Sequence, residues 1–208
     1  MRKADFKKNH LEFERWIIWY GDFLKKLIEA KKVVTSDFEK MELVEALVLR
    51  CAVRWEVLIE DDIIASLNHD SSAYANNLGL RLRKHLTRDE SEAMIIGHRY
   101  MDFKSVADVK KFAKKYLVPK YNPFEHIPSP NAEKIDEFMI FRNFLAHYSG
   151  YSKRAYRKMM VKKYSYTRVP EPGAFLIKVN PKTHAYRWSD YLVNFLRCSE
   201  KMRLAIYK

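Results

Sequence analysis

The most constraining feature of the chain is a long stretch, from Ser36 to Leu67, that contains neither glycine nor proline. It opens with a capping box, in which Ser36 is followed three residues later by Glu39. The middle, from Met41 to Ile64, is apolar nearly all round a helical projection. Such a pattern is typical of a helix that neighbours cover on several sides. The sequence therefore predicts a long, central helix.

The rest of the chain also favours helices. Only five glycines and seven prolines occur, which indicates long helices joined by short connections. Apolar residues at three- and four-residue steps and further capping boxes mark where the helices begin. The predicted helices cover residues 4–31, 36–67, two shorter segments that begin at Thr87 and Ser105, 130–149, 152–163 and 189–208.

A small β element is expected near the C-terminal end. After Pro170, Pro172 and Gly173, the residues from Phe175 to Val179 have the composition of a short strand or hairpin arm. We therefore predict an all-α protein with a small β-hairpin or strand near residues 174–187. At 208 residues the chain is long enough to bury a core, and residues 1–208 are predicted to form one domain.

The two cysteines indicate a reducing compartment. Cys51 and Cys198 lie far apart within helical apolar patterns, which is typical of buried free thiols. The basic N-terminus is followed by polar residues, and charges interrupt every long apolar stretch. We expect a cytoplasmic protein with no signal peptide and no membrane helix.

The formal charge of +13 points to a polyanionic partner. A surplus of this size on a small domain attracts polyanions at long range and releases counterions when it meets phosphate. The alternative is that the lysines only solvate the surface. Binding to a membrane surface would require the charge to lie on one face of an amphipathic helix.

Three polar residues near the end of an apolar helix form the strongest motif, namely Arg142, Asn143 and His147. Histidine exchanges protons near neutral pH, so His147 can act as a general base or acid. The planar guanidinium of Arg142 can hold two phosphate oxygens. An arginine and a histidine in the last turns also favour the helix dipole, so a structural role is the alternative.

Helical geometry separates these residues. Asn143 and His147, four residues apart, share one face, so Asn143 is predicted to contact the imidazole and fix its tautomer. Arg142 and His147, five apart, diverge by about 140° on a straight helix. Arg142 is therefore expected to reach the same phosphate only if the helix distorts or a second copy supplies part of the site.

The Arg142-Asn143-x-x-x-His147 pattern resembles the motif of the HEPN superfamily, with the resemblance covering about residues 36–168. The chain has seven histidines, and His147 is the only one that follows an arginine at the spacing of that motif. The resemblance implies a HEPN-like helical bundle, with the N-terminal helix and the C-terminal hairpin and helix as additions. It implies a metal-independent endoribonuclease that leaves 2′,3′-cyclic phosphate and 5′-hydroxyl ends.

The same resemblance implies a homodimer in which both motifs face one cleft, so that a single protomer is inactive. Such nucleases commonly serve as toxins or antiviral-defence effectors, which makes an antitoxin or a defence-system protein a further expected partner. Two other functions stay open at this point. One is a non-catalytic RNA-binding module, and the other is a protein-interaction module whose charge is incidental.

A basic, tyrosine-rich run follows the motif. It contains no acidic residue between Asn143 and Pro170. Cations can follow an RNA backbone while aromatic rings stack on unpaired bases. The alternative is a solvated helix face with the tyrosines packed inward. The predicted RNA-binding residues are Tyr151, Lys153, Arg154, Arg157, Lys158, Lys162 and Lys163.

A supporting acid is predicted on the long helix. Glu56 lies in an apolar stretch, where a buried carboxylate needs a partner, and Arg142 would serve. An ordinary ion pair with Arg54 or a surface position is the alternative. The sequence contains no Glu-x-x-His motif and only two distant cysteines, so neither a metal site nor a cofactor is expected.

Overall fold

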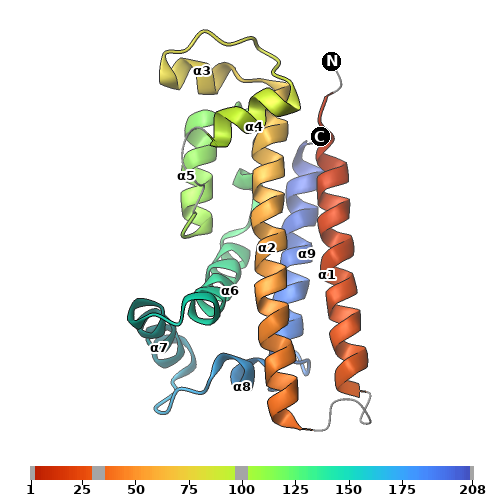
Figure 1. Cartoon of the computed structure of the whole chain (residues 1–208), viewed down its shortest axis with the longest axis vertical. Coiled ribbons are helices and arrows are strands. Elements are labelled where there is room, and N and C mark those ends of the chain that lie inside the picture. The colour runs from red at the N-terminus through yellow and green to blue at the C-terminus, as the bar shows by residue number, and fades with distance from the viewer. Residues whose placement is uncertain (1–2, 30–35, 97–102, 207–208) are drawn as a thin grey trace. The chain divides into compact units, whose positions relative to one another are not determined.

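The computed structural model describes residues 3–29, 36–96 and 103–206, and within these ranges the chain is helical without a β-sheet. The all-α class is confirmed. Figure 1 shows the elements along the chain. They are α1 (Phe6–Glu29), α2 (Asp37–His69), α3 (Ser72–Leu78), α4 (Arg88–Ile96), α5 (Val106–Tyr116), the 3₁₀ turns η1 (Pro119–Tyr121) and η2 (Phe124–His126), α6 (Ser129–His147), α7 (Gly150–Tyr164), α8 (Pro172–Leu176) and α9 (Arg187–Ile206).

The predicted capping box begins α2. The Glu39 amide donates to Ser36 Oγ at 3.2 Å, and the Ser36 amide donates to Glu39 Oε2 at 2.9 Å. These two bonds satisfy amides that the first turn of a helix leaves without partners. Neighbours do not cover every side of this helix, because Val53 and Val57 are 51% and 42% exposed.

Internal contacts divide the chain into two compact units. The first unit comprises Met1–Glu14, Trp55–Ala132 and Arg197–Lys208, and the second comprises Arg15–Arg54 and Glu133–Leu196. The long helix α2 contributes residues to both units. The expectation of a single domain stays a prediction.

The first unit contains a buried polar cluster around His10. His10 Nδ1 lies 2.8 Å from Ser199 Oγ, and His10 Nε2 lies 3.0 Å from Asp62 Oδ2. Ser199 in turn donates to Glu14 Oε1 at 2.9 Å. His10, Asp62 and Ser199 have no exposed surface at all. Since buried charges are costly unless paired, these contacts are what make the cluster tolerable in a core.

Aromatic side chains form the core of the second unit. The Phe141 ring stacks on Phe175 at 5.6 Å and meets Tyr191 edge-on at the same centroid distance. Phe138 meets Phe195 edge-on at 4.9 Å. These are the offset and T-shaped geometries that aromatic pairs prefer. They hold α6, α8 and α9 together.

A buried carboxylate lies beside this aromatic core. Glu137, on α6, is 3% exposed. It accepts hydrogen bonds from the hydroxyls of Tyr164 and Tyr191 and, at 2.6 Å, from Lys163 Nζ. Burial and the Glu137 charge raise the pKa of Tyr164 and the pKa of Tyr191 well above the usual value of a phenol. Both phenols therefore stay protonated and act as donors that stabilise the carboxylate.

The predicted strand from Phe175 to Val179 is wrong at its beginning. Pro172 occupies the first turn of α8, a position that proline favours, and the helix continues to Leu176. The segment after α8 forms one antiparallel bridge, between Val179 and Tyr186. This bridge is flanked by bonds from Asn180 N to Ala185 O and from Arg187 N to Lys178 O.

The short helix α8 packs very closely on α2. The Gly173 amide donates to Glu45 Oε1 at 2.7 Å. A Cβ at Gly173 would lie 2.8 Å from Met41 Cβ and 2.9 Å from the Met41 carbonyl oxygen. Only a residue without a side chain permits this approach.

Candidate active site

The motif helix α6 ends at the motif histidine. His147 is its last residue, and Tyr148 adopts the left-handed conformation with φ of 45°. The Tyr148 amide still donates to the Phe144 carbonyl at 3.0 Å. Ser149 then caps α7 by accepting a bond from the Ser152 amide at 3.2 Å. The sequence predicted a motif helix over residues 130–149 that stops before Gly150, whereas α6 ends at His147 and Gly150 is the first residue of α7.

The three motif side chains meet within one protomer. Arg142 Nη1 donates to Asn143 Oδ1 at 2.9 Å and lies 3.4 Å from His147 Nε2. Because a guanidinium carries only donors, the Nε2 lone pair must accept. The neutral imidazole in this contact therefore carries its proton on Nδ1. Arg142 and Asn143 are half-buried, whereas His147 is exposed.

Two expectations about this geometry need correction. The structure gives Asn143 a bond with Arg142, whereas the sequence predicted a contact with the imidazole. Arg142 reaches His147 without a second copy and with α6 intact from Ser129 to His147. The separation along the axis is about 7.5 Å for five residues. The long arginine side chain spans it by running along the helix.

The predicted basic face lies on α7. Its buried side consists of Ser152, Tyr156 and Met160, spaced four residues apart. The cations of the predicted set occupy the exposed positions between them, and Tyr151 is 77% exposed. These exposed cations are Lys153, Arg154, Arg157, Lys158, Lys162 and Lys163. Of these, Lys163 pairs with Glu137, so part of its charge is neutralised.

The tyrosines of the basic run divide into two groups. Tyr156 is buried and its hydroxyl donates to the Pro170 carbonyl at 2.7 Å, while Tyr164 bonds to Glu137. Burial raises the pKa of Tyr156. Both residues therefore support the core. Tyr148 and Tyr151, at 58% and 77% exposure, are the ones whose rings can meet a ligand.

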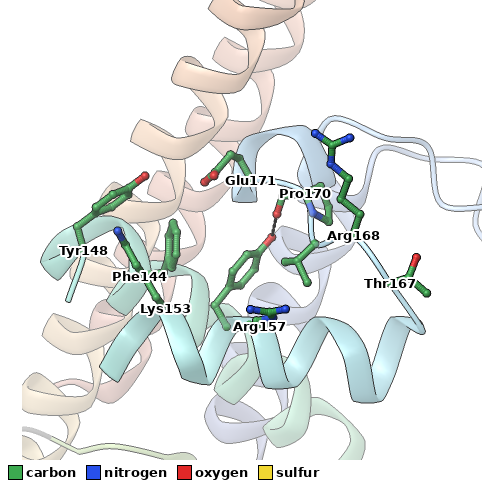
Figure 2. A pocket seen from close by; sticks show the side chains of 10 residues that line it. Phe144, Tyr148, Lys153, Arg157, Thr167, Arg168, Pro170 and Glu171 are labelled. Carbon is green, nitrogen blue, oxygen red and sulfur yellow. Dashed lines mark hydrogen bonds between the residues drawn. The ribbon is translucent and has the colours of Figure 1, made fainter. Parts of the chain in front are cut away.

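A cavity of about 410 Å³ lies beside the motif, in the second unit. It is lined from the end of α6, from α7 and from the segment that leads to α8, as Figure 2 shows. Tyr148 and Glu171 are among the lining residues that the sequence analysis did not predict. The adjacency of Tyr148 to His147 was the one signal available for it. The lining includes Phe144, Tyr148, Lys153, Arg157, Arg168 and Glu171.

The predicted role of Glu56 as a supporting acid is not tested. Glu56 is half-buried on α2 and belongs to the first unit, whereas Arg142 belongs to the second. Its pairing with Arg142 therefore stays a prediction. Arg54, the other partner considered for it, lies over the Trp16 ring, 4.0 Å from the centroid.

The described part of the chain holds neither a metal cluster nor a membrane span. Over residues 3–29, 36–96 and 103–206, no three His, Cys, Asp or Glu side chains gather in a way that could hold a metal ion. None of the helices in those ranges is long and apolar enough to cross a membrane. Comparison with protein-family models, curated proteins and solved structures gives no match for this chain.

Proposed function

We propose that the protein is a metal-independent endoribonuclease of the HEPN type. The observation that carries this proposal is the 3.4 Å approach of Arg142 Nη1 to His147 Nε2 at the exposed end of α6. A proton acceptor and a permanent cation at this distance can act on the same phosphodiester. The resemblance of Arg142, Asn143 and His147 to the HEPN motif supports an endoribonuclease as the type of enzyme.

The reaction uses these two groups. His147 Nε2 takes the proton of the ribose 2′-hydroxyl, and the 2′-oxygen attacks the adjacent phosphorus. The bond from phosphorus to the 5′-oxygen breaks, which leaves a 2′,3′-cyclic phosphate and, after protonation, a 5′-hydroxyl. Arg142 stabilises the charge that develops on the phosphate oxygens. When the phosphate binds, Arg142 turns from the imidazole to the phosphate, which frees the Nε2 lone pair.

A second proton donor completes the reaction. The proposed assembly is a homodimer with both motifs in one cleft, so that the histidine of the second protomer protonates the leaving 5′-oxygen. The proposal includes the HEPN-like arrangement of the bundle and a role as a cytoplasmic toxin or antiviral-defence effector. An antitoxin or defence-system protein would then bind the nuclease.

The exposed cations of α7 supply the proposed RNA surface. Lys153 and Arg157, and likewise Arg154 and Lys158, are one helical turn apart on the exposed side. Rows of this kind follow a phosphate backbone and make binding strongly salt-dependent. Because α7 starts three residues after His147, a strand bound along α7 would pass the motif.

The test is cleavage of labelled RNA in excess EDTA. We expect cutting by the parent protein, ends that carry a 2′,3′-cyclic phosphate, and no cutting by His147→Ala. The matched control is His126→Ala, which removes another exposed histidine and should cut as the parent does. Sedimentation under assay conditions should show a dimer.

Other outcomes assign other functions. Binding of RNA without cutting would indicate a non-catalytic RNA-binding module. Neither binding nor cutting would indicate a protein-interaction module. Cutting that EDTA abolishes, or equal cutting by His147→Ala, would overturn the proposed mechanism.

A further inference from the structure

The cavity beside the motif has the chemistry of a nucleotide site, and this inference rests on the proposed RNA-cutting function. Its lining combines an exposed aromatic ring, three cations and one carboxylate: Tyr148, Lys153, Arg157, Arg168 and Glu171. In Figure 2, Tyr148 and Lys153 stand at one end, Thr167 and Arg168 at the other, and Glu171 between them. Tyr148 directly follows His147, so the cavity adjoins the scissile position.

Tyr148 is held ready as a stacking platform. The ring centroids of Tyr148 and Phe144 are 5.1 Å apart. Lys153 Nζ lies over the Tyr148 ring, 3.9 Å from its centroid. Its backbone is left-handed, with φ of 45°, which is costly for a bulky side chain. The ring is nevertheless 58% exposed. A braced, exposed aromatic ring is the usual surface on which an unpaired base stacks.

The cations fit the phosphates of the same nucleotide. Arg157 and Arg168 are exposed and line the cavity from α7 and from the segment before α8. Guanidinium groups hold phosphate oxygens in pairs. Lys153 adds a charge at the Tyr148 end, next to the motif.

Glu171 distinguishes the base. It precedes α8, yet its side chain makes no capping hydrogen bond with that helix. A carboxylate offers two acceptor oxygens and no donor. The Watson–Crick edge of guanine offers two adjacent donors, N1–H and the N2 amino group, whereas adenine and cytosine offer one amino group beside an acceptor. Uracil offers one donor between two carbonyls.

We infer that this cavity binds a guanine nucleotide of single-stranded RNA next to the cleaved bond, with the base on Tyr148 and its edge on Glu171. A simple anion would meet the Glu171 carboxylate, and a neutral ligand would leave the cations unused. A guanine nucleotide satisfies both kinds of group. The site thus gives the nuclease a preferred neighbour for the bond it cuts.

The test measures binding separately from cutting. The His147→Ala protein is titrated in EDTA with labelled oligouridylates that carry one central G, A or C, and binding is followed by fluorescence anisotropy. We expect the G oligonucleotide to bind about tenfold more tightly than the others, which is the effect of one good base contact. Adding Glu171→Gln should remove this preference, because the amide keeps only one acceptor.

Two further variants test the stacking platform. Tyr148→Ala should lower the binding affinity for every oligonucleotide about tenfold. Tyr148→Phe keeps the ring and should leave these affinities unchanged. Arg197→Ala, which removes an exposed arginine of α9, is the matched control and should change nothing. Equal affinity for the G, A and C oligonucleotides, or a preference that persists in Glu171→Gln, would overturn the inference. A guanine preference in a protein that never cuts RNA would keep the site and remove only the proposed nuclease.

Discussion

Two histidines, His10 and His147, lie in opposite surroundings, one buried and one exposed. His10 meets a serine and an aspartate, the residue types of a hydrolase triad, but the whole cluster is buried. Moreover, the Ser199 hydroxyl donates its hydrogen bond to Glu14 and not to His10, so the imidazole does not activate Ser199 as a nucleophile. His147 has an arginine beside it and solvent in front of it. Access to solvent, more than the residue types, separates the proposed catalytic histidine from the buried one.

The largest expected effect is on catalysis at the exposed histidine. His147→Gln should lower the initial rate of RNA cleavage by about 10²–10⁴-fold, the usual contribution of a general acid or base. Its free energy of unfolding should stay within about 0.5 kcal/mol of the parent value, because the residue is exposed. Urea denaturation checks the second expectation. A large loss of stability would remove the contrast with His10.

The buried histidine should show the reverse behaviour. His10→Ala leaves the buried Asp62 carboxylate without its imidazole partner, which costs about 3–5 kcal/mol. The urea midpoint should fall accordingly. The cleavage rate per folded molecule should not change. A cleavage defect at full stability would show that the His10 cluster takes part in the reaction.

Removing the hydroxyl of the cluster should have a smaller effect. Ser199 links His10 to Glu14 through two hydrogen bonds, at 2.8 and 2.9 Å. Ser199→Ala removes the hydroxyl that His10 Nδ1 and Glu14 Oε1 share, and the loss of this partner costs about 1–3 kcal/mol of folding free energy. The same urea titration measures it. An unchanged midpoint would contradict the role of this hydroxyl as a bridge.

The smallest effect is expected in thiol reactivity beside that cluster. Burial raises the pKa of Cys198 to about 12, with Lys110 opposing the shift slightly. At pH 8 only about one molecule in ten thousand carries the reactive thiolate. Alkylation by iodoacetamide, followed by peptide mass spectrometry, should therefore be slow in the native protein and fast in urea. His10→Ala should accelerate it by opening the cluster more often.

The direction of the pH effect comes from the same shift. The pKa of Cys198 is higher in the folded than in the unfolded chain, so the folded thiol keeps its proton more firmly. Its contribution to stability is complete below the unfolded value, about pH 8.5. That contribution is lost as the pH rises toward 12. Cys198→Ala should make the alkaline loss of stability less steep, and an unchanged slope would contradict this.

The helices were predictable because their signals are local. The capping box at Ser36 and Glu39 and the helical spacing of the α7 cations are set by residues close in sequence. The end of α6 was less accessible, since the expected glycine lies two residues beyond Tyr148, where the turn occurs. The strand predicted from Phe175 was wrong at its beginning because Pro172 starts α8, and this helix carries Phe175 into the aromatic core.

Within the candidate site, the motif residues could be identified from the sequence, but their contacts could not. The motif spacing identified Arg142 and His147, yet an average helical angle cannot show how far an arginine reaches along the surface. Glu137 was missed because the residues that donate hydrogen bonds to it, Lys163, Tyr164 and Tyr191, are distant in sequence. The Glu137 pairing with Tyr191 spans 54 positions. Burial and pairing of this kind arise only when the chain has folded.

The tight contact at Gly173 has a practical consequence for engineering. The segment that carries Arg168 and Glu171 is fastened to α2 at a point with no space for even one methyl group. A mutant library aimed at changing base preference should therefore vary residues 167–171 and leave Gly173 untouched. Residues 167–171 can then vary in sequence while Gly173 keeps its close contact with α2.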